Sequence, residues 1–314
     1  MDALGVHVHA WWLCQRAGPV LDREQHDHLR AAVSDHAEPR LQTGPAGQYP
    51  RHVRASHGRQ QVRTAQEIMT ATVAALYRHP VKGLGFEPMA RFDLTADAPV
   101  PGDRAYALLH AGAEYIDTWQ PRRNFLVVAY GPDLARIRVR TEADGRLTLS
   151  HPERPDLTVD PDTEGPALRD WVRPLWPAQH SAPHRLVTAP AESMADNGLA
   201  QVSILNLATL ADLSARLGQD LQIERFRGNI VLDGLAPWAE FNLVGETVAI
   251  GGATFAVTER IERCRATEAN PLTGQRDANT LRALEEGWGH RDFGIYATVT
   301  GAGAVALGDA LARL

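Results

Sequence analysis

The sequence predicts a mainly β protein of the α+β class, with two β-rich halves and a few short helices. Short apolar and β-branched runs recur from residue 70 onward, and turn-forming pairs such as Gly102-Asp103 and Asp144-Gly145 separate them. Helical spacing of apolar residues occurs in only a few short segments. The proline-rich run at residues 173–190 is interpreted as a boundary or linker. Many short strands with frequent turns are typical of a β-barrel or a sandwich.

The first half begins with a strand at residues 72–77, which ends before His79-Pro80. Asp144-Gly145 is a hairpin signal between two later strands. A short helix is expected at residues 165–172, before Pro174. Further strands are expected at residues 104–110, 114–117, 124–130, 135–141 and 146–150.

The second half begins near Asp196 and continues into a strand at residues 202–205. Asn206 is expected to cap a helix that runs through Leu217, because leucines follow at helical spacing and Gly218 ends the run. The remaining expected elements are a helix at 277–286 and strands at 229–233, 247–250, 253–259, 296–300 and 305–307.

Composition limits the classes of partner. The chain has 314 residues, of which 44% are apolar and 22% charged, and its formal net charge of −6 argues against general nucleic-acid binding. No run approaches the ~18 consecutive apolar residues of a membrane helix, and the first residues lack the pattern of a signal peptide. Two distant cysteines do not make a disulfide framework. We therefore expect a soluble, cytoplasmic protein with no membrane or nucleic-acid partner.

Residues 1–68 differ from the rest of the chain. They hold seven of the 13 histidines and a run rich in Gly, Pro, Gln and Arg at residues 39–61. Met69 directly precedes the first expected strand. We expect residues 1–68 to be a disordered tail or an over-extended translation start. Mass analysis of the native N-terminus that finds an intact Met1 or Asp2 would exclude the second possibility.

Cys264 is one of only two cysteines, and it lies between Arg263 and Arg265 just after the expected strand at 253–259. A thiol acts as a nucleophile or metal ligand only as the thiolate, and neighbouring guanidinium charge lowers its pKa. The alternative is that Cys264 is an inert, small buried residue.

Positively charged residues recur beside the expected turns and strand ends. Lys82 is the only lysine among 32 basic residues, so either this position needs a compact ammonium or one lysine has persisted by chance. The run from Arg225 to Asn229 alternates charged and apolar residues. If this run is a strand, Arg225, Arg227 and Asn229 lie on one face of it. If such cations converge, they form an oxyanion or phosphate site, and otherwise they are solvated surface.

Several common catalytic motifs are absent from the sequence. It contains no G-x-G-x-x-G between a strand and a helix, no Walker loop, no G-x-S-x-G and no H-E-x-x-H. Dinucleotide binding, P-loop chemistry, α/β-hydrolase chemistry and zincin chemistry are therefore unsupported.

Four segments nevertheless resemble motifs of a known family and occur in the same order as in that family, over roughly residues 71–311. Residues 76–83 (LYRHPVKG) and 101–108 (PGDRAYAL) resemble motifs of the β-barrel domain that precedes MOSC domains. Residues 225–234 (RFRGNIVLDG) and 263–274 (RCRATEANPLTG) resemble motifs of the MOSC domain itself. The resemblance implies an N-terminal β-barrel-like domain at 69–185 packed on a MOSC β-barrel domain at 186–314, after the extension at 1–68.

The family includes the mitochondrial amidoxime-reducing component and bacterial MOSC reductases, which bind molybdopterin between the two domains. The resemblance therefore implies a molybdenum-cofactor-dependent oxidoreductase that reduces N-hydroxylated or N-oxide small molecules. It implies that Cys264 is the catalytic metal ligand, because a thiolate is a soft ligand for molybdenum. The residues implied to bind the cofactor are Lys82, Arg104, Arg225, Arg227 and Asn229, with Ser203 and Tyr296 close to it.

The chain departs from the family pattern at informative positions. Gly83 replaces the serine that usually follows the motif lysine, and Ile261 replaces the first cysteine of a frequent C-x-x-C. The chain has no cysteines for an iron–sulfur cluster, so electrons are expected from a separate reductase of the ferredoxin or flavoprotein type. Pyridoxal phosphate is not expected, because it needs a Schiff-base lysine and the only candidate, Lys82, lies in the β-barrel motif, which is the wrong context. Two alternatives remain: a sulfur carrier with a persulfide on Cys264, and a cofactor-binding module without turnover.

Overall fold

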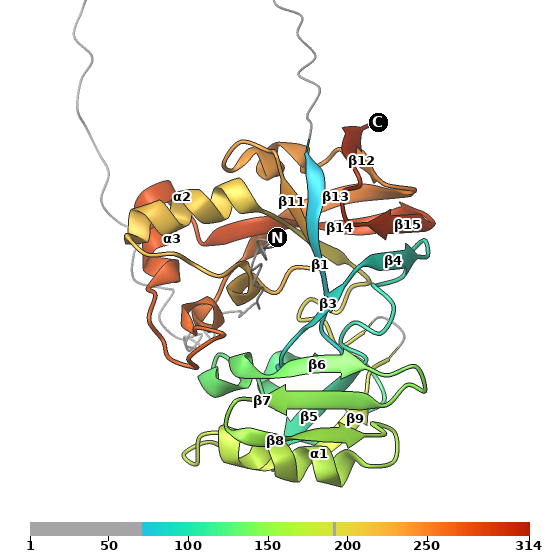
Figure 1. The fold of residues 1–314 in the computed structure, drawn as a ribbon, viewed down its shortest axis with the longest axis vertical. Helices are drawn as coiled ribbons and strands as arrows, with labels where there is room; N and C mark the ends of the chain where they lie inside the picture. Colours follow the sequence, from blue (N-terminus) through green and yellow to red (C-terminus); the bar gives the residue numbers. More distant parts are fainter. Residues whose placement is uncertain (1–70, 191–192) are drawn as a thin grey trace, which may run out of the picture. The chain divides into compact units, whose positions relative to one another are not determined.

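Strands dominate the computed structural model, which describes residues 71–190 and 193–314 (Figure 1). These residues lie within one structural unit and contain three α-helices. The predicted mainly β fold is therefore confirmed. The expectation for residues 1–68 lies outside the described residues.

A mixed eight-stranded sheet is the framework of the structure, in the order β16-β12-β13-β14-β10-β11-β1-β3. Strand β1 comes from the first half of the chain and pairs antiparallel with β11, with Leu76 opposite Ile230. The sheet therefore joins both halves of the sequence. Its strands are β1 (Thr72–Arg78), β3 (Glu87–Met89), β10 (Val202–Asn206), β11 (Ile230–Asp233), β12 (Thr247–Ile250), β13 (Ala253–Glu262), β14 (Asp292–Gly301) and β16 (Leu311–Arg313).

Three smaller sheets complete the strand pairing of the described residues. The first pairs β15 (Gly303–Ala306) with β4 (Arg91–Leu94), which again joins the two halves. The second and third consist of β2 (Val81–Lys82), β5 (Tyr106–His110) and β9 (Pro183–Thr188), and of β6 (Arg138–Thr141), β7 (Leu147–His151) and β8 (Arg154–Val159).

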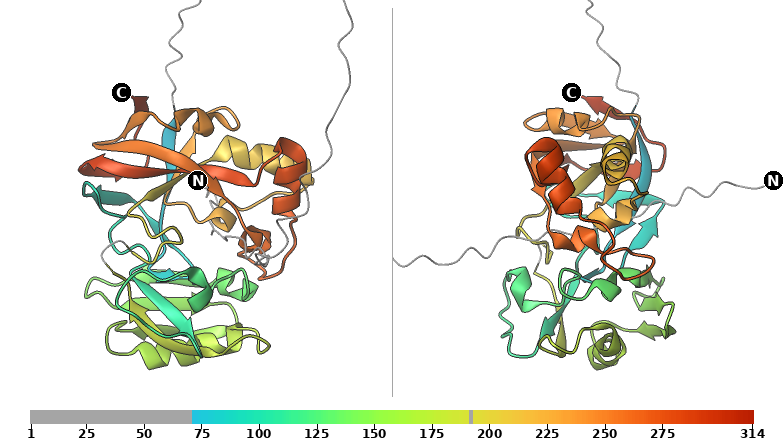
Figure 2. Two further views of the ribbon diagram at one scale, coloured as in Figure 1. Left: turned by 180° about the vertical axis from the view of Figure 1, so that it is seen from behind. Right: turned by 90° about the vertical axis from the view of Figure 1, so that its left-hand side faces the viewer.

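The helices end where local sequence signals place them. In α2 (Leu207–Leu217), the Asn206 side chain accepts a hydrogen bond from the Ala208 N–H at 3.0 Å, and Gly218 ends the helix with a φ of 66°. This helix connects the parallel strands β10 and β11. The views in Figure 2 show α2 beside α3 (Thr280–Trp288), while α1 (Gly165–Val172) packs on β8 and β9.

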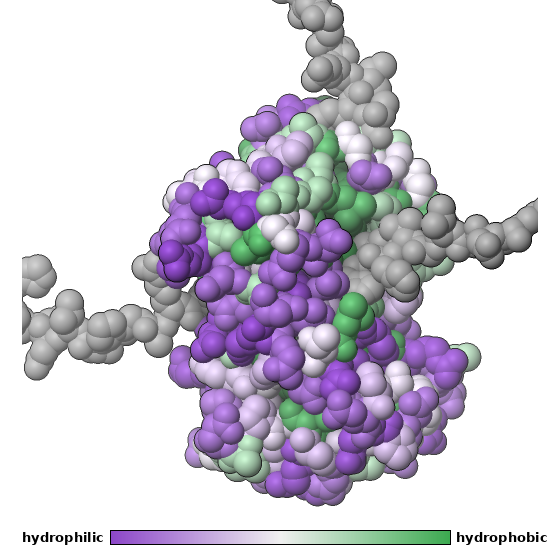
Figure 3. Space-filling model, turned by 60° about the vertical axis from the view of Figure 1, so that its left-hand side comes forward, coloured by the Kyte–Doolittle hydropathy of each residue, from purple (hydrophilic) through white to green (hydrophobic). Residues whose placement is uncertain are grey.

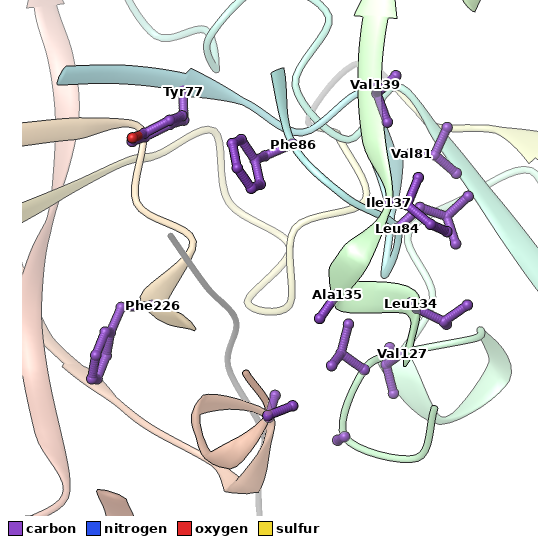
Figure 4. Close-up of a cluster of buried hydrophobic side chains, with 14 of the residues drawn as sticks. Tyr77, Val81, Leu84, Phe86, Val127, Leu134, Ala135, Ile137, Val139 and Phe226 are labelled. Carbon is purple, nitrogen blue, oxygen red and sulfur yellow. The ribbon is translucent and has the colours of Figure 1, made fainter. Parts of the chain in front are cut away.

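Two apolar cores flank the large sheet. One contains Val73, Leu76 and Phe255, and the other contains Tyr77 and Phe226 together with apolar residues of both halves. Tyr77 and Phe86 meet edge to face with ring centroids 5.2 Å apart. Figure 4 shows this second core, in which side chains of β1, β6 and the intervening loops lie together. The core therefore continues across the boundary predicted from the sequence.

Some predicted elements are wrong. Residues 114–117 are irregular, and residues 124–130 form a single bridge at Phe125 and turns, although Phe125, Leu126 and Val128 are buried. Apolar runs predict burial, but ladder pairing needs a neighbouring strand. The run at 173–190 is not only a linker, because it contains a 3₁₀ turn and β9. Strands β2, β3, β4, β8 and β16 were not predicted.

Among the described residues, no helix combines the length and the apolar character that a membrane crossing requires. On the face drawn in Figure 3, hydrophilic residues cover most of the described surface, and smaller apolar areas lie between them.

Candidate functional site

A small polar pocket opens beside the centre of the large sheet, and residues of both halves line it. Arg104 comes from the first half, and the other lining residues come from the loop before β10, from β10 itself, from the turn before β11, and from β13–β14. The complete lining is Arg104, Ala195, Asp196, Asn197, Gln201, Ser203, Arg227, Asn229, Arg263 and Tyr296.

Three buried arginines supply the positive charge of the pocket. Arg104 pairs with Asp103 and donates from Nη2 to the Arg227 carbonyl at 3.2 Å. Arg227 donates to the Leu84 carbonyl, which ties the turn before β11 to the first half. Arg104 and Arg227 are non-glycine residues with positive φ values of 52° and 40°. Such conformations are uncommon and cluster at functional sites.

Arg263 is held by backbone carbonyls of two elements. Its Nε donates to the Phe293 carbonyl at 2.7 Å, and its Nη1 donates to the Phe226 carbonyl at 3.1 Å. Gly294, with a φ of 76°, allows this close packing, because a Cβ there would lie 2.7 Å from the Ile204 carbonyl oxygen and 3.3 Å from Arg263 Nη2. Arg263 is thus fixed as part of the pocket wall.

The buried charges at the site are mostly positive. Burial, reinforced by Arg104, holds the pKa of Arg227 well below its usual range, and burial lowers the pKa of Arg263 to about 10. Burial, followed by Arg227 and Arg104, also holds the pKa of His79 well below its usual value. The His79 ring is therefore neutral at pH 7. An anion in the pocket would relieve this repulsion.

Ser203 and Asn229 form the neutral part of the wall. The Ser203 hydroxyl donates to Asn229 Oδ1 at 2.8 Å, and Asn229 Nδ2 donates to the Tyr77 carbonyl at 3.2 Å. Tyr296 lies opposite Ser203 in the pairing of β10 with β14, and burial raises the pKa of its phenol. The structure therefore brings Arg104, Ser203, Arg227, Asn229 and Tyr296, five of the predicted site residues, to one pocket.

Lys82 lies at the site but is not among the residues that line the pocket. Its side chain is 0% exposed, and its ammonium forms a salt bridge with Asp196 and donates to the Met194 carbonyl at 2.5 Å. Burial lowers its pKa, and Asp196 opposes this shift.

The prediction that Arg225, Arg227 and Asn229 share one face of a strand is wrong. Residues Ile223–Phe226 form a 3₁₀ turn, and the backbone of Arg227 has a left-handed conformation. The alternation of side chains between the two faces of a strand therefore does not apply here. Arg225 instead pairs with Asp277 at 2.6 Å and donates to the Glu268 carbonyl at 3.1 Å. It is buried outside the pocket and links its turn to the segment before α3.

Cys264 caps the 3₁₀ turn Arg265–Glu268, and its Sγ accepts a hydrogen bond from the Ala266 N–H at 3.2 Å. It is 3% exposed and is not a lining residue, although it interacts electrostatically with Asp196 and Arg263. Burial raises its pKa to about 12. The expectation that neighbouring arginines lower this pKa is wrong, because desolvation of the thiolate outweighs their charge.

Asp196 and Asp103 are two acidic residues at the site that the sequence analysis missed. Each provides the counter-charge to a buried cation, Lys82 or Arg104. Asp103 stands directly before Arg104, in the motif at 101–108, and could have been noticed there. Asp196 carries no local signal, because its partner lies 114 residues away. Among the described residues, no three His, Cys, Asp or Glu side chains are grouped as a metal site.

Comparison with known proteins identifies the two halves. Residues 70–180 match the model of the MOSC N-terminal beta barrel domain, and residues 193–312 match the model of the MOSC domain. Together these matches cover most of the described residues.

Relatives with curated names include molybdenum cofactor sulfurases. The protein from Caenorhabditis briggsae is 32% identical over 97 residues, which are 30% of this chain and 13% of that protein. The protein from Anopheles gambiae is 26% identical over 217 residues, which are 54% of this chain and 28% of that protein. The chain thus spans less than a third of the length of these relatives.

Two solved structures are also similar. The YuaD protein from Bacillus subtilis has a TM-score of 0.38 and 14% identity, over 77% of this chain and 94% of that chain. YiiM from Geobacillus stearothermophilus has a TM-score of 0.29 and 18% identity, over 36% of this chain and 53% of that chain. The two family models, in the order found along the sequence, identify the chain as a member of the MOSC family with an N-terminal MOSC β-barrel domain.

Proposed function

We propose that the chain binds a molybdenum cofactor, molybdopterin, in this pocket and uses it to reduce N-hydroxylated or N-oxide compounds. The observation that carries the proposal is the grouping of buried cations at the pocket. Lys82, Arg104, Arg227 and Arg263 are buried together; Asp196 pairs with Lys82, and Asp103 pairs with Arg104. Buried charge costs free energy unless a counter-charge compensates it. The phosphate of molybdopterin is an anion of the required kind.

The residues present fit the proposed cofactor by their chemistry. Arginine forks bind two phosphate oxygens at once, and Ser203 and Asn229 add neutral hydrogen-bonding groups. Cys264 offers a soft sulfur ligand for the metal. The names of the curated relatives, which contain the molybdenum cofactor, support this cofactor class.

Within this proposal, the chain binds the cofactor and manages protons. Cys264 must release its proton on ligation, because its thiol is protonated at neutral pH. Arg263 and Arg122 interact electrostatically with this sulfur and stabilise the thiolate that forms. When bound, the cofactor would supply exchange of two electrons and one oxygen atom with the substrate.

The overall reaction must balance. An N–OH group takes up two electrons and two protons, and it yields N–H and water. The electrons would come from a separate reductase of the ferredoxin or flavoprotein type.

The test is cofactor analysis of the whole protein. The protein is purified from a host that makes molybdopterin, and molybdenum and pterin per chain are measured for wild type, Cys264→Ser and the matched control Cys14→Ser. We expect about one molybdenum per chain in wild type and control, and loss of the metal or of amidoxime reduction in Cys264→Ser. Wild type without molybdenum or pterin would contradict the proposal.

Sulfur transfer through a persulfide on Cys264 is the second candidate, favoured by the sulfurase names of the relatives. Its difficulty is the raised pKa of Cys264, because sulfur transfer needs the thiolate. The test measures the sulfur that cyanide releases from the protein. If metal-free wild type carries such sulfur and Cys264→Ser does not, sulfur transfer is the function and the first proposal is wrong. If the protein binds about one cofactor per chain but reduces no N-hydroxylated compound, it is a cofactor-binding module without turnover.

A further inference from the structure

The ammonium of Lys82 stands behind the pocket wall rather than in the pocket. It is 0% exposed, its Nζ is engaged by Met194 and Asp196, and it lies 5.8 Å from the centre of the Phe125 ring. Asp196 belongs to the lining, whereas Lys82 does not. A ligand in the pocket therefore meets the carboxylate of this pair before it meets the cation.

The two carboxylate oxygens of Asp196 differ in their hydrogen bonding. Oδ1 binds Lys82, whereas the buried Oδ2 has no hydrogen-bond partner among residues 71–190 and 193–314. The side chain is only 5% exposed. A buried acceptor without a donor is costly and needs an explanation. A donor on a bound ligand supplies one, because Asp196 lines the pocket.

We propose that Asp196 accepts a hydrogen bond from an N–H or O–H group of the bound ligand, and that Lys82 acts through Asp196 as a positioning residue. The identity of the ligand rests on the function proposed above. The pocket combines three arginines with this acceptor, so it selects a molecule that carries both an anionic group and a hydrogen-bond donor. A phosphorylated pterin has both features.

This arrangement also explains why the single lysine is at residue 82. Its compact ammonium donates to the Met194 carbonyl and pairs with Asp196, two residues apart on the same loop. The planar fork of an arginine presents its donors in a different geometry. The carbonyl of Met194 and the carboxylate of Asp196 are thereby fixed relative to the pocket.

The first test needs no cofactor. Inorganic phosphate is titrated into cofactor-free protein, and binding is measured by calorimetry for wild type, Asp196→Asn and the control Asp162→Asn. Asp162 is an exposed aspartate that accepts a hydrogen bond from the Tyr106 hydroxyl. Removing a negative charge from the lining should tighten phosphate binding about ten-fold in Asp196→Asn only. Equal affinity in wild type and Asp196→Asn, or no binding by either, would overturn the assignment of Asp196 to the ligand.

The second test uses the loaded protein and a double-mutant cycle. Pterin retained per chain after gel filtration is compared for Asp196→Asn, Lys82→Met and the double variant. We expect Asp196→Asn to lose pterin although it binds phosphate more tightly, and the double variant to lose no more than Asp196→Asn alone. An additive loss in the double variant would mean that Lys82 contacts the ligand itself, and would overturn the positioning role.

Two measures keep these outcomes distinct. Near-ultraviolet circular dichroism establishes that each variant is folded, and Lys82→Arg replaces Lys82→Met in the cycle if the latter does not fold. Wild type without pterin would refute the proposed function and with it the pterin as ligand. The phosphate titration would still decide whether Asp196 faces the pocket.

Discussion

Burial has a larger effect on the pKa of the Cys264 thiol than the neighbouring positive charges have. The two arginines beside it in the sequence do not surround the sulfur, because Arg263 donates to the carbonyls of Phe226 and Phe293 and Arg265 is exposed. Direct neighbours in an extended chain point in opposite directions, so adjacency in sequence overstates electrostatic contact. The thiol of the cofactor-free protein is therefore a weak nucleophile.

Alkylation kinetics check this statement. In a Cys14→Ser background without cofactor, we expect iodoacetamide at pH 8 to modify Cys264 on the order of 1,000-fold more slowly than free cysteine, because only the thiolate reacts. The rate should still be rising above pH 10, since the pKa is raised to about 12. Mass spectrometry of quenched samples measures it. Modification as fast as that of free cysteine would contradict the assigned burial.

At the scale of elements, a buried polar cluster fastens α2 to the segment after β11. Asn206 caps the helix and donates from Nδ2 to Glu240 at 2.8 Å, and the Thr209 hydroxyl also donates to Glu240. Glu240 is 0% exposed, and burial raises its pKa despite these hydrogen bonds. This carboxyl group therefore links the start of α2 to the segment after β11.

The raised pKa of Glu240 predicts a pH-dependent stability. The folded protein keeps the Glu240 proton to a higher pH than the unfolded chain, whose glutamate pKa is about 4.3. The contribution of this group is therefore full below that pH and is lost as pH rises through the folded-state pKa. In urea unfolding from pH 4.5 to 8, we expect Glu240→Gln to gain stability relative to wild type as pH rises.

The control is Glu246→Gln, which alters an exposed glutamate near the same turn. If the difference between Glu240→Gln and wild type is constant with pH, Glu240 does not carry the shifted titration.

At the scale of the whole molecule, the two sequence halves share their main sheet and one of their cores. Strands β1 and β3 precede the predicted domain boundary but belong to the sheet of the second half, and β4 pairs with β15. Arg276 of the second half donates to the Ala129 carbonyl of the first at 2.7 Å. The pocket lies where these halves meet, since Arg104 and Arg227 come from opposite sides.

Fragment complementation tests this sharing. A chain of residues 186–314 alone lacks β1 and so exposes the edge of β11. We expect it to be insoluble or molten, and co-expression with residues 69–185 to restore a single cooperative unfolding transition. Near-ultraviolet circular dichroism and thermal denaturation measure both. A fragment 186–314 that unfolds cooperatively by itself would contradict the shared framework.

The sequence alone determined the mainly β class and the cap and end of α2, and its resemblance to a family pointed to five of the ten residues that line the pocket. These features depend on local signals, such as Asn206 and Gly218, or on motifs whose residues keep their order along the chain. Short apolar runs were less informative, because burial of residues such as Phe125 does not require a strand partner.

Only the tertiary structure decided which charged groups meet. Arg225 faces Asp277 instead of the pocket because the chain turns at residues 223–227, and no periodicity in the sequence marks that turn. Lys82 meets Asp196 across 114 positions, and the Cys264 pKa follows from desolvation by surrounding segments. Burial and charge pairing depend on distances in space, which long-range packing sets and which a local pattern does not encode.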